Sequence, residues 1–136
     1  MSRQDPGAAT GEWTLTIPAP ADWLNVNQRH KRRPSGTIKA WRQAALVYAR
    51  QAKLPRLQRA HILAELRFHN RVRRDTGNYY PTIKACVDGL VTDYGLLPDD
   101  STAYLIGPDL RLGDVVPRKR FGPSGEVVLT IREVAS

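Results

Sequence analysis

The chain has 136 residues, of which 21 are lysine or arginine and 13 are aspartate or glutamate, which gives a formal net charge of +8 at pH 7. This length favours one folded domain with one hydrophobic core, and the absence of any run of about 18 apolar residues argues against a transmembrane helix. The single cysteine, Cys86, excludes an internal disulfide, and its apolar neighbours predict a small buried side chain in a reducing compartment.

The N-terminal part of the sequence predicts a tail, a strand and a helix. Residues 1–12 lack the apolar core of a signal peptide and are expected to form a disordered tail, with the folded domain spanning residues 13–136. Residues 13–18 alternate large apolar residues with threonine, which predicts a strand with one buried face. Apolar residues then recur at helical spacing over residues 37–53, so a helix is expected there, ending before Pro55.

The middle of the chain predicts a second strand and a second helix. Residues 61–68 place every second apolar side chain on one face, as expected of a half-buried strand. A helix should start just after Asn78, because Pro81 suits a first helical turn and Gly95 is a natural C-cap. Its apolar stripe consists of Tyr80, Ile83, Val87, Leu90, Val91 and Tyr94.

The C-terminal third predicts two more strands separated by a loop. Residues 101–106 form a short strand candidate, and residues 107–125, rich in glycine, proline and arginine, are expected to form a long loop. Residues 126–134 show the clearest strand pattern in the chain. The predicted fold is therefore a small single-domain α/β protein with a mixed β-sheet and two main helices.

Clustered basic residues favour a nucleic-acid ligand. Arginine forks bind phosphates in pairs of hydrogen bonds, and basic patches bind nucleic acid with release of counterions. RNA is disfavoured as the partner, because the few aromatic residues fall mainly on apolar stripes and not on a stacking platform. The basic residues expected to contact DNA are Arg29, Lys31, Arg32, Arg33, Arg71, Arg73, Arg74, Arg118, Lys119 and Arg120.

Acidic residues at both ends of the second helix are candidates for a metal site. Asp75 precedes this helix, while Asp99 and Asp100 follow it. Cleavage of a phosphodiester with Mg²⁺ requires carboxylates that converge on the ion. A helix of roughly 15 residues is about 22 Å long, so its two ends can share an ion only if the chain folds back along the helix.

Each candidate also has a purely structural interpretation. Asp75 and Asn78 are good N-cap residues. Lys84 and Asp88 have the spacing of an ordinary exposed ion pair on a helix. The two aspartates after the helix follow a proline and are common in turns. These residues, taken alone, leave both interpretations open.

The order of these elements resembles the RusA family of Holliday junction resolvases. The resemblance covers nearly all of residues 13–134 and depends on several segments in the same order. These segments read WTLTIPAP, LNVNQRHKRR, LAELRF, RRD, KACVDGL, LLPDDS and EVVLTIREV. The stretch NYYPT before Lys84 is similar to an actinobacterial or actinophage branch of that family.

The resemblance implies a function, a site and a set of partners. The implied activity is Mg²⁺-dependent paired cleavage of a four-way DNA junction by a homodimer, in the cytoplasm of a bacterial or phage-infected cell, with Mn²⁺ as a possible substitute. Asp75, Lys84 and Asp100 match the catalytic residues. Asp75, Asp99 and Asp100 are the implied metal ligands, and the clustered basic residues would hold the DNA.

One departure from the family pattern bears on catalysis. The family reads Asp-x-Asp-Asn at this point, whereas this chain has Gly77 in place of the second aspartate, and the segment that follows is three residues longer. A retained metal site would then need another ligand, such as Asn78, Asp88, Asp99 or a water. The alternative is a catalytically weakened or inactive protein that binds branched DNA.

Overall fold

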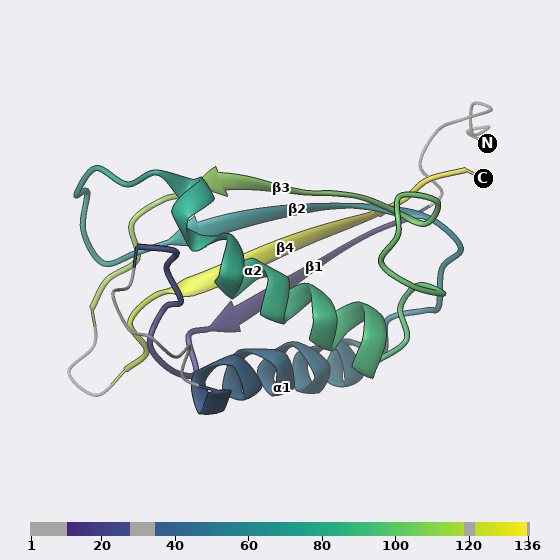
Figure 1. The fold of residues 1–136 in the computed structure, drawn as a ribbon, viewed down its shortest axis with the longest axis horizontal. Helices are drawn as coiled ribbons and strands as arrows, with labels where there is room; N and C mark the ends of the chain where they lie inside the picture. Colours follow the sequence, from purple (N-terminus) through teal and green to yellow (C-terminus); the bar gives the residue numbers. More distant parts are fainter. Residues whose placement is uncertain (1–10, 28–34, 119–121, 136) are drawn as a thin grey trace, which may run out of the picture.

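Alternating apolar and polar residues build a four-stranded mixed sheet. The computed structural model describes residues 11–27, 35–118 and 122–135. The strands are β1 (Glu12–Pro18), β2 (Ala60–Arg67), β3 (Leu105–Leu112) and β4 (Glu126–Glu133). They lie in the order β1-β4-β2-β3 (Figure 1), with β2 and β3 parallel and the other two pairs antiparallel. The α/β class with a mixed sheet is confirmed.

The register of the central strands is fixed by burial on one face. On β2, Ile62, Ala64 and Leu66 are fully buried, and on β4, Leu129 and Ile131 are fully buried. Because side chains alternate between the faces of a strand, a slip of one residue would turn these groups to the other face. The predicted strand at residues 61–68 and the predicted buried face are therefore confirmed.

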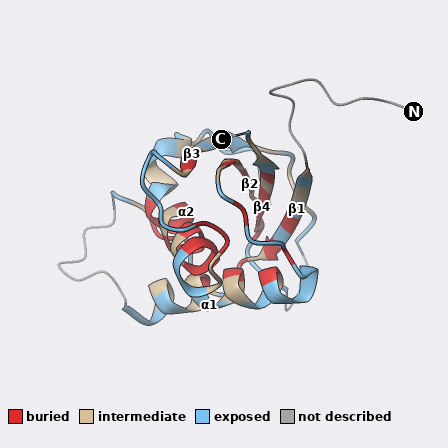
Figure 2. Ribbon diagram, turned by 90° about the vertical axis from the view of Figure 1, so that its right-hand side faces the viewer, coloured by how far each residue is buried: buried red, intermediate tan, exposed pale blue. Residues whose placement is uncertain are grey.

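Two helical elements cover the same face of the sheet. The first is α1 (Ser35–Ala52), which buries Trp41, Ala45 and Ala49. The second is a continuous element made of a 3₁₀ turn η1 (Thr76–Tyr79), α2 (Tyr80–Val87) and a π turn η2 (Asp88–Asp93). Figure 2 shows buried residues on the sides of helices and strands that face one another.

The helix predicted to start just after Asn78 corresponds to α2, while the 3₁₀ turn η1 extends the helical element back to Thr76. Pro81 lies in the first turn of α2. Gly95 adopts a positive φ of 89° just after η2, a conformation that favours glycine as a helix terminator. Cys86 is fully buried, as predicted, and burial raises the pKa of its thiol to about 12.

The π turn is pressed closely against α1 through a glycine. A Cβ added at Gly89 would lie 2.1 Å from the carbonyl oxygen of Arg42. No side chain can occupy that space without moving one helix. Gly89 is therefore the residue that allows α1 and η2 to approach each other.

The prediction for the third strand is wrong in its position. A strand was expected at residues 101–106 with a loop from 107 onward, whereas β3 runs over Leu105–Leu112. Gly107 and Pro108 suggested a loop, but β3 lies at the edge of the sheet, where a proline is tolerated. Its register against β2 shifts between His61 and Leu63, which accommodates the irregular backbone.

The chain continues along β2 beyond β3 instead of leaving the sheet at once. The backbone N–H of Gly113 donates to the carbonyl of Leu66, and that of Val116 donates to the carbonyl of Phe68. Residues 119–121 of the expected loop lie outside the described residues. Within the described ranges, no helix is both long enough and apolar enough to cross a membrane.

Candidate functional site

The chain after η2 folds back along the second helix. The N–H of Leu96 donates to the carbonyl of Leu90, and the carbonyl of Leu96 accepts from the N–H of Leu57. Leu96 is fully buried, so an apolar side chain holds the returning segment in place. This return brings Asp100 next to Lys84, which lies in α2.

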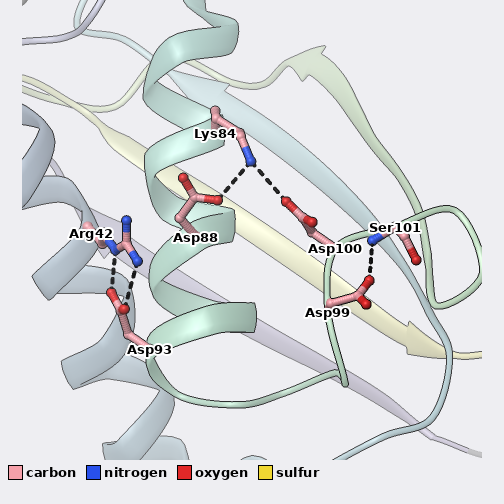
Figure 3. Close-up of polar contacts among 7 residues, drawn as sticks. All are labelled: Arg42, Lys84, Asp88, Asp93, Asp99, Asp100 and Ser101. Atoms are coloured by element: carbon pink, nitrogen blue, oxygen red, sulfur yellow. Dashed lines mark hydrogen bonds and ion pairs between the residues drawn. The ribbon is translucent and has the colours of Figure 1, made fainter.

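Lys84 is the centre of a three-residue ionic cluster. Its Nζ donates to Oδ1 of Asp88 at 2.8 Å and to Oδ2 of Asp100 at 3.0 Å (Figure 3). The hydrogen bonds to Asp88 and Asp100 raise the pKa of Lys84 to about 12, and the bond to Asp88 has the larger effect. The hydrogen bond from Lys84 in turn holds the pKa of Asp100 below its ordinary value. We call Lys84, Asp88 and Asp100 the Lys84 cluster.

Asp99 points away from the Lys84 cluster. Its Oδ1 accepts a hydrogen bond from the backbone N–H of Ser101 at 2.7 Å, and Figure 3 shows its carboxylate turned toward that residue. This contact is typical of an aspartate that stabilises a turn. The structure therefore separates the roles of the two neighbouring aspartates, and only Asp100 reaches Lys84.

Asp75 caps the start of the second helical element. Its Oδ1 accepts from the N–H of Gly77 at 3.0 Å, and its carbonyl accepts from the N–H of Asn78 at 3.1 Å. Among the described residues, no hydrogen bond or ion pair joins Asp75 to the Lys84 cluster. The N-cap interpretation of Asp75 thus describes its contacts in this conformation.

The expected magnesium ligands are not gathered around one point in this conformation. Within the described part of the chain, no group of three or more histidine, cysteine, aspartate or glutamate side chains lies close enough to hold a metal ion. The two carboxylates that do converge, those of Asp88 and Asp100, share the ammonium of Lys84. Mg²⁺ requires octahedral oxygen coordination, so this donor set does not fit a resident Mg²⁺ as it stands.

A second ion pair lies close to the Lys84 cluster and was missed in the sequence. Arg42 of α1 binds Asp93 of η2 through two hydrogen bonds, from Nε at 2.5 Å and from the second terminal nitrogen at 2.9 Å. These hydrogen bonds raise the pKa of Arg42 and lower that of Asp93. The two residues are 51 positions apart, so no local spacing could have indicated the pair.

The arginines of residues 71–74, directly before Asp75, divide into two kinds. Arg71 and Arg73 are exposed, and no hydrogen bond or ion pair within the described residues holds them. The guanidinium of Arg74 instead donates to the carbonyls of Asn70 and Val72, both at 3.2 Å, and to Oδ1 of Asn70 at 2.8 Å.

Arg74 also stacks on an aromatic cluster. Its guanidinium carbon lies 3.9 Å from the centre of the Phe68 ring, which itself packs against Trp23 and Tyr79. Arg74 therefore shapes the loop that carries Arg71 and Arg73, and both of its terminal guanidinium nitrogens are engaged within the protein. Of the other basic residues expected to bind DNA, Arg118 is exposed. Outside the described residues lie Arg29, Lys31, Arg32, Arg33, Lys119 and Arg120.

The segment that leads into residues 28–34 is fixed to the start of the second helical element. The buried hydroxyl of Thr82 donates to the carbonyl of Leu24 and accepts from its N–H, both at 2.8 Å. The N–H of Val26 donates to the carbonyl of Asn78 at 2.8 Å. Residues 24–27 thus lie beside the turn that Asp75 caps.

The hollows of the described surface differ in their relation to this site. A small one of about 60 Å³ lies between α2 and β3, and Lys84 and Asp100 both line it. A larger hollow of about 360 Å³ lies at the start of β4, beside His69 and Glu126. None of the candidate site residues lines it. The small hollow is therefore the one that bears on the chemistry of the Lys84 cluster.

No protein-family model matches the chain, and no curated protein matches it. The resemblance to RusA resolvases thus depends on the order of the sequence segments alone.

Proposed function

We propose that this chain is a structure-selective endonuclease that cuts branched DNA, as its resemblance to RusA resolvases implies. The observation that carries the proposal is the contact between Lys84 and Asp100, which are 16 positions apart. The resemblance assigns catalytic roles to both residues, and the fold places them at one point of the surface. An ion pair with a purely structural role could be formed by many other charged residues of the chain. The pairing of these two residues therefore supports a catalytic role for them.

The charge distribution supports DNA as the substrate. The net charge of +8 favours association with a polyanion. The exposed Arg71 and Arg73 lie in the loop just before Asp75, on a segment held by Arg74 and Phe68. A phosphate bound by these arginines would lie near the start of the second helical element.

The proposal includes a divalent cation and a second copy of the chain. Phosphodiester cleavage of this type is expected to need Mg²⁺, with Mn²⁺ as a substitute. A four-way junction has opposing strands related by symmetry, so paired cuts require two active sites, which a homodimer supplies. The expected location is the cytoplasm of a bacterial or phage-infected cell.

Cleavage of a synthetic four-way junction tests the proposal. The full-length chain is incubated with the labelled junction, or with linear duplex of the same sequence, in the presence of Mg²⁺ or Mn²⁺. Paired nicks in the junction alone, lost in Asp75→Asn, are expected. Asp109→Asn is the matched control, because Asp109 pairs with His61, whose side chain lies on the face of β2 opposite the buried one, and it should cut like wild type.

A second candidate function is branched-DNA binding without cleavage. It is favoured by the absence of a three-ligand group among the described residues and by Gly77 in the position where the family has an aspartate. A Cβ at Gly77 would have only Oδ1 of Asp75 within 4 Å, at 3.4 Å, so Gly77→Asp should fold. If the site is degraded, Gly77→Asp should create or raise cleavage; an unchanged rate would count against this candidate.

A further inference from the structure

We propose that three exposed cations at the C-terminal end of α1 and just beyond it, Arg50, Lys53 and Arg56, bind the phosphate backbone of a DNA arm. They form a second set of phosphate contacts, separate from Arg71 and Arg73 in the loop before Asp75. The inference rests on the proposed function in its choice of DNA as the polyanion. Its test measures binding in the absence of metal ions and therefore does not depend on cleavage.

The stretch of chain that contains these cations has no acidic residue. Residues 23–64 hold ten of the 21 lysines and arginines and none of the 13 aspartates and glutamates. Arg50, Lys53 and Arg56 are exposed, and no hydrogen bond or ion pair among the described residues involves their side chains. Arg42 of the same helix, by contrast, is neutralised by Asp93. The positive charge at the end of α1 is therefore available to a polyanion.

Lys53 occupies a backbone conformation that favours glycine. Its φ is 53°, in the left-handed region. Its N–H donates to the carbonyl of Arg50 at 3.1 Å, and the N–H of Leu54 donates to the carbonyl of Ala49 at 3.3 Å. These two bonds form a common helix end in which the left-handed residue is usually glycine. A lysine in this conformation lowers the stability of the fold, which points to a role for its charge outside the fold.

The segment after α1 is joined to the segment that carries Asp100. The N–H of Leu57 donates to the carbonyl of Leu96 at 2.7 Å. The guanidinium of Arg56 lies against Gly95, where an added Cβ would be 3.5 Å from its Nε. Figure 1 shows the end of α1 and the end of the second helical element side by side. The basic surface therefore adjoins the returning segment that leads to the proposed site.

The two sets of cations lie at opposite ends of the second helical element. Arg71 and Arg73 precede its start at Thr76, whereas Arg56 lies just beyond its end at Asp93. This element is about 27 Å long at 1.5 Å per residue, which corresponds to about eight base pairs of DNA. Because the Lys84 cluster lies between the two ends, an arm that contacts both sets passes the proposed site.

Arg50 also has a purely structural explanation. It lies in the last turn of α1, where a positive charge interacts favourably with the helix dipole. Lys53 and Arg56 lie beyond the last helical residue, Ala52. The test therefore uses substitutions of these two residues and leaves Arg50 unchanged.

Fluorescence anisotropy of a labelled four-way junction, titrated with the full-length chain in EDTA at several salt concentrations, tests the inference. The double variant Lys53→Gly, Arg56→Gln should reduce the slope of log affinity against log salt concentration by about 2, with about tenfold or weaker binding at 0.1 M salt. Lys53→Gly alone should reduce the slope by about 1 while raising the urea midpoint of unfolding. Lys53→Arg keeps the charge and should bind like wild type.

The double variant Arg111→Gln, Arg132→Gln is the matched control. It removes the same charge from two exposed residues, which pair in register with Glu65 and His61 on the face of β2 opposite the buried one. Its slope should equal that of wild type. Circular dichroism and urea unfolding establish that each variant is folded. If Lys53→Gly is less stable than wild type, Lys53→Gln replaces it with the same expected loss of affinity.

Two results would overturn the inference. One is a wild-type slope in the folded double variant of Lys53 and Arg56; the other is an equal reduction in the control variant, which would make the effect a general one of net charge. A wild-type chain that does not bind the junction would overturn both the inference and the proposed function. A chain that binds through these cations but leaves the junction uncut in Mg²⁺ and Mn²⁺ would refute the function while the inference stands.

Discussion

Nζ of Lys84 lies 3.0 Å from Oδ2 of Asp100, although the two residues are 16 positions apart in the sequence. The contact exists because the chain returns along the second helical element after Gly95, held by the buried Leu96. The fold thereby brings a residue in the middle of a helix into contact with a residue in the turn that follows it, and the proposed chemistry depends on this contact.

Asp100→Asn should abolish most of the proposed cleavage at little cost in stability. The ion pair is half exposed, with side chains 43% and 46% accessible, so the free energy of unfolding should fall by less than about 1 kcal/mol. The rate of junction cleavage should fall about 100-fold or more, as for loss of a group that stabilises charge in the transition state. Urea unfolding and single-turnover cleavage measure the two effects, and Asp109→Asn is the control; an unchanged cleavage rate would exclude Asp100 from the site.

Substitution of Arg73 should mainly weaken DNA binding, whereas substitution of Arg74 should mainly lower the stability of the fold. Arg73→Gln removes an exposed charge, so the slope of log affinity for DNA against log salt concentration should decrease by about 1. Arg74→Gln removes a guanidinium that holds the loop and stacks on Phe68, so it should lower the free energy of unfolding by about 1–3 kcal/mol. Fluorescence anisotropy at several salt concentrations and urea unfolding check both. Equal effects of the two substitutions on the slope would contradict this division.

Thr82→Val should destabilise the fold. The hydroxyl is fully buried and satisfies both the N–H and the carbonyl of Leu24. Valine has nearly the same shape but leaves two buried backbone groups unpaired, which should cost about 2–4 kcal/mol in urea unfolding. Thr130→Val, on the half-exposed outer face of β4, is the control and should change stability by less than about 0.5 kcal/mol. Similar values for both would show that Thr82 does not anchor residues 24–27.

Gly89→Ala should separate α1 from η2. The added methyl group would lie 2.1 Å from the carbonyl of Arg42, and such overpacking costs about 1–3 kcal/mol or more. At Gly36, near the start of α1, an added Cβ has no atom within 4 Å, so Gly36→Ala should be neutral or slightly stabilising. Thermal unfolding of both variants measures the contrast, and a neutral Gly89→Ala would mean that the helices tolerate a wider spacing.

Acid should weaken the Arg42–Asp93 pair in a defined direction. The hydrogen bond from Arg42 lowers the pKa of Asp93 in the folded state. The pair therefore makes its full contribution to the free energy of unfolding at pH values above the ordinary pKa of aspartate. That contribution is lost as the pH falls below about 4 and through the lowered pKa. In urea unfolding, Asp93→Asn should be less stable than wild type at pH 6, and the difference should narrow toward pH 3. A difference that stays constant over this range would contradict the sign of the shift.

Residue patterns predicted most of the fold because burial imposes strict periodicity on it. Ile62, Ala64 and Leu66 alternate as a half-buried strand must, and the pattern located β2 to within one residue. The position of β3 in the sequence could not be predicted in the same way. It is an edge strand in which Gly107 and Pro108 interrupt the alternation, and its pairing with β2 is a tertiary property.

The candidate site could be predicted only in part, because some of its contacts are also tertiary and leave no local pattern in the sequence. The pair of Lys84 and Asp88 follows from helical spacing, whereas the approach of Asp100 depends on the returning segment. Asp75 was expected to share an ion with Asp100, but in this conformation its carboxylate caps the N–H of Gly77. The ion pair of Arg42 and Asp93 joins two helices and has no local signature.

The most direct test of the central claim is a map of the cuts that the wild-type chain makes in one four-way junction labelled separately on each of its four strands. The account predicts, in Mg²⁺ or Mn²⁺, one cut at matching positions in each of two opposing strands, with linear duplex left intact. A junction that the protein binds but leaves uncut in both metals would contradict it.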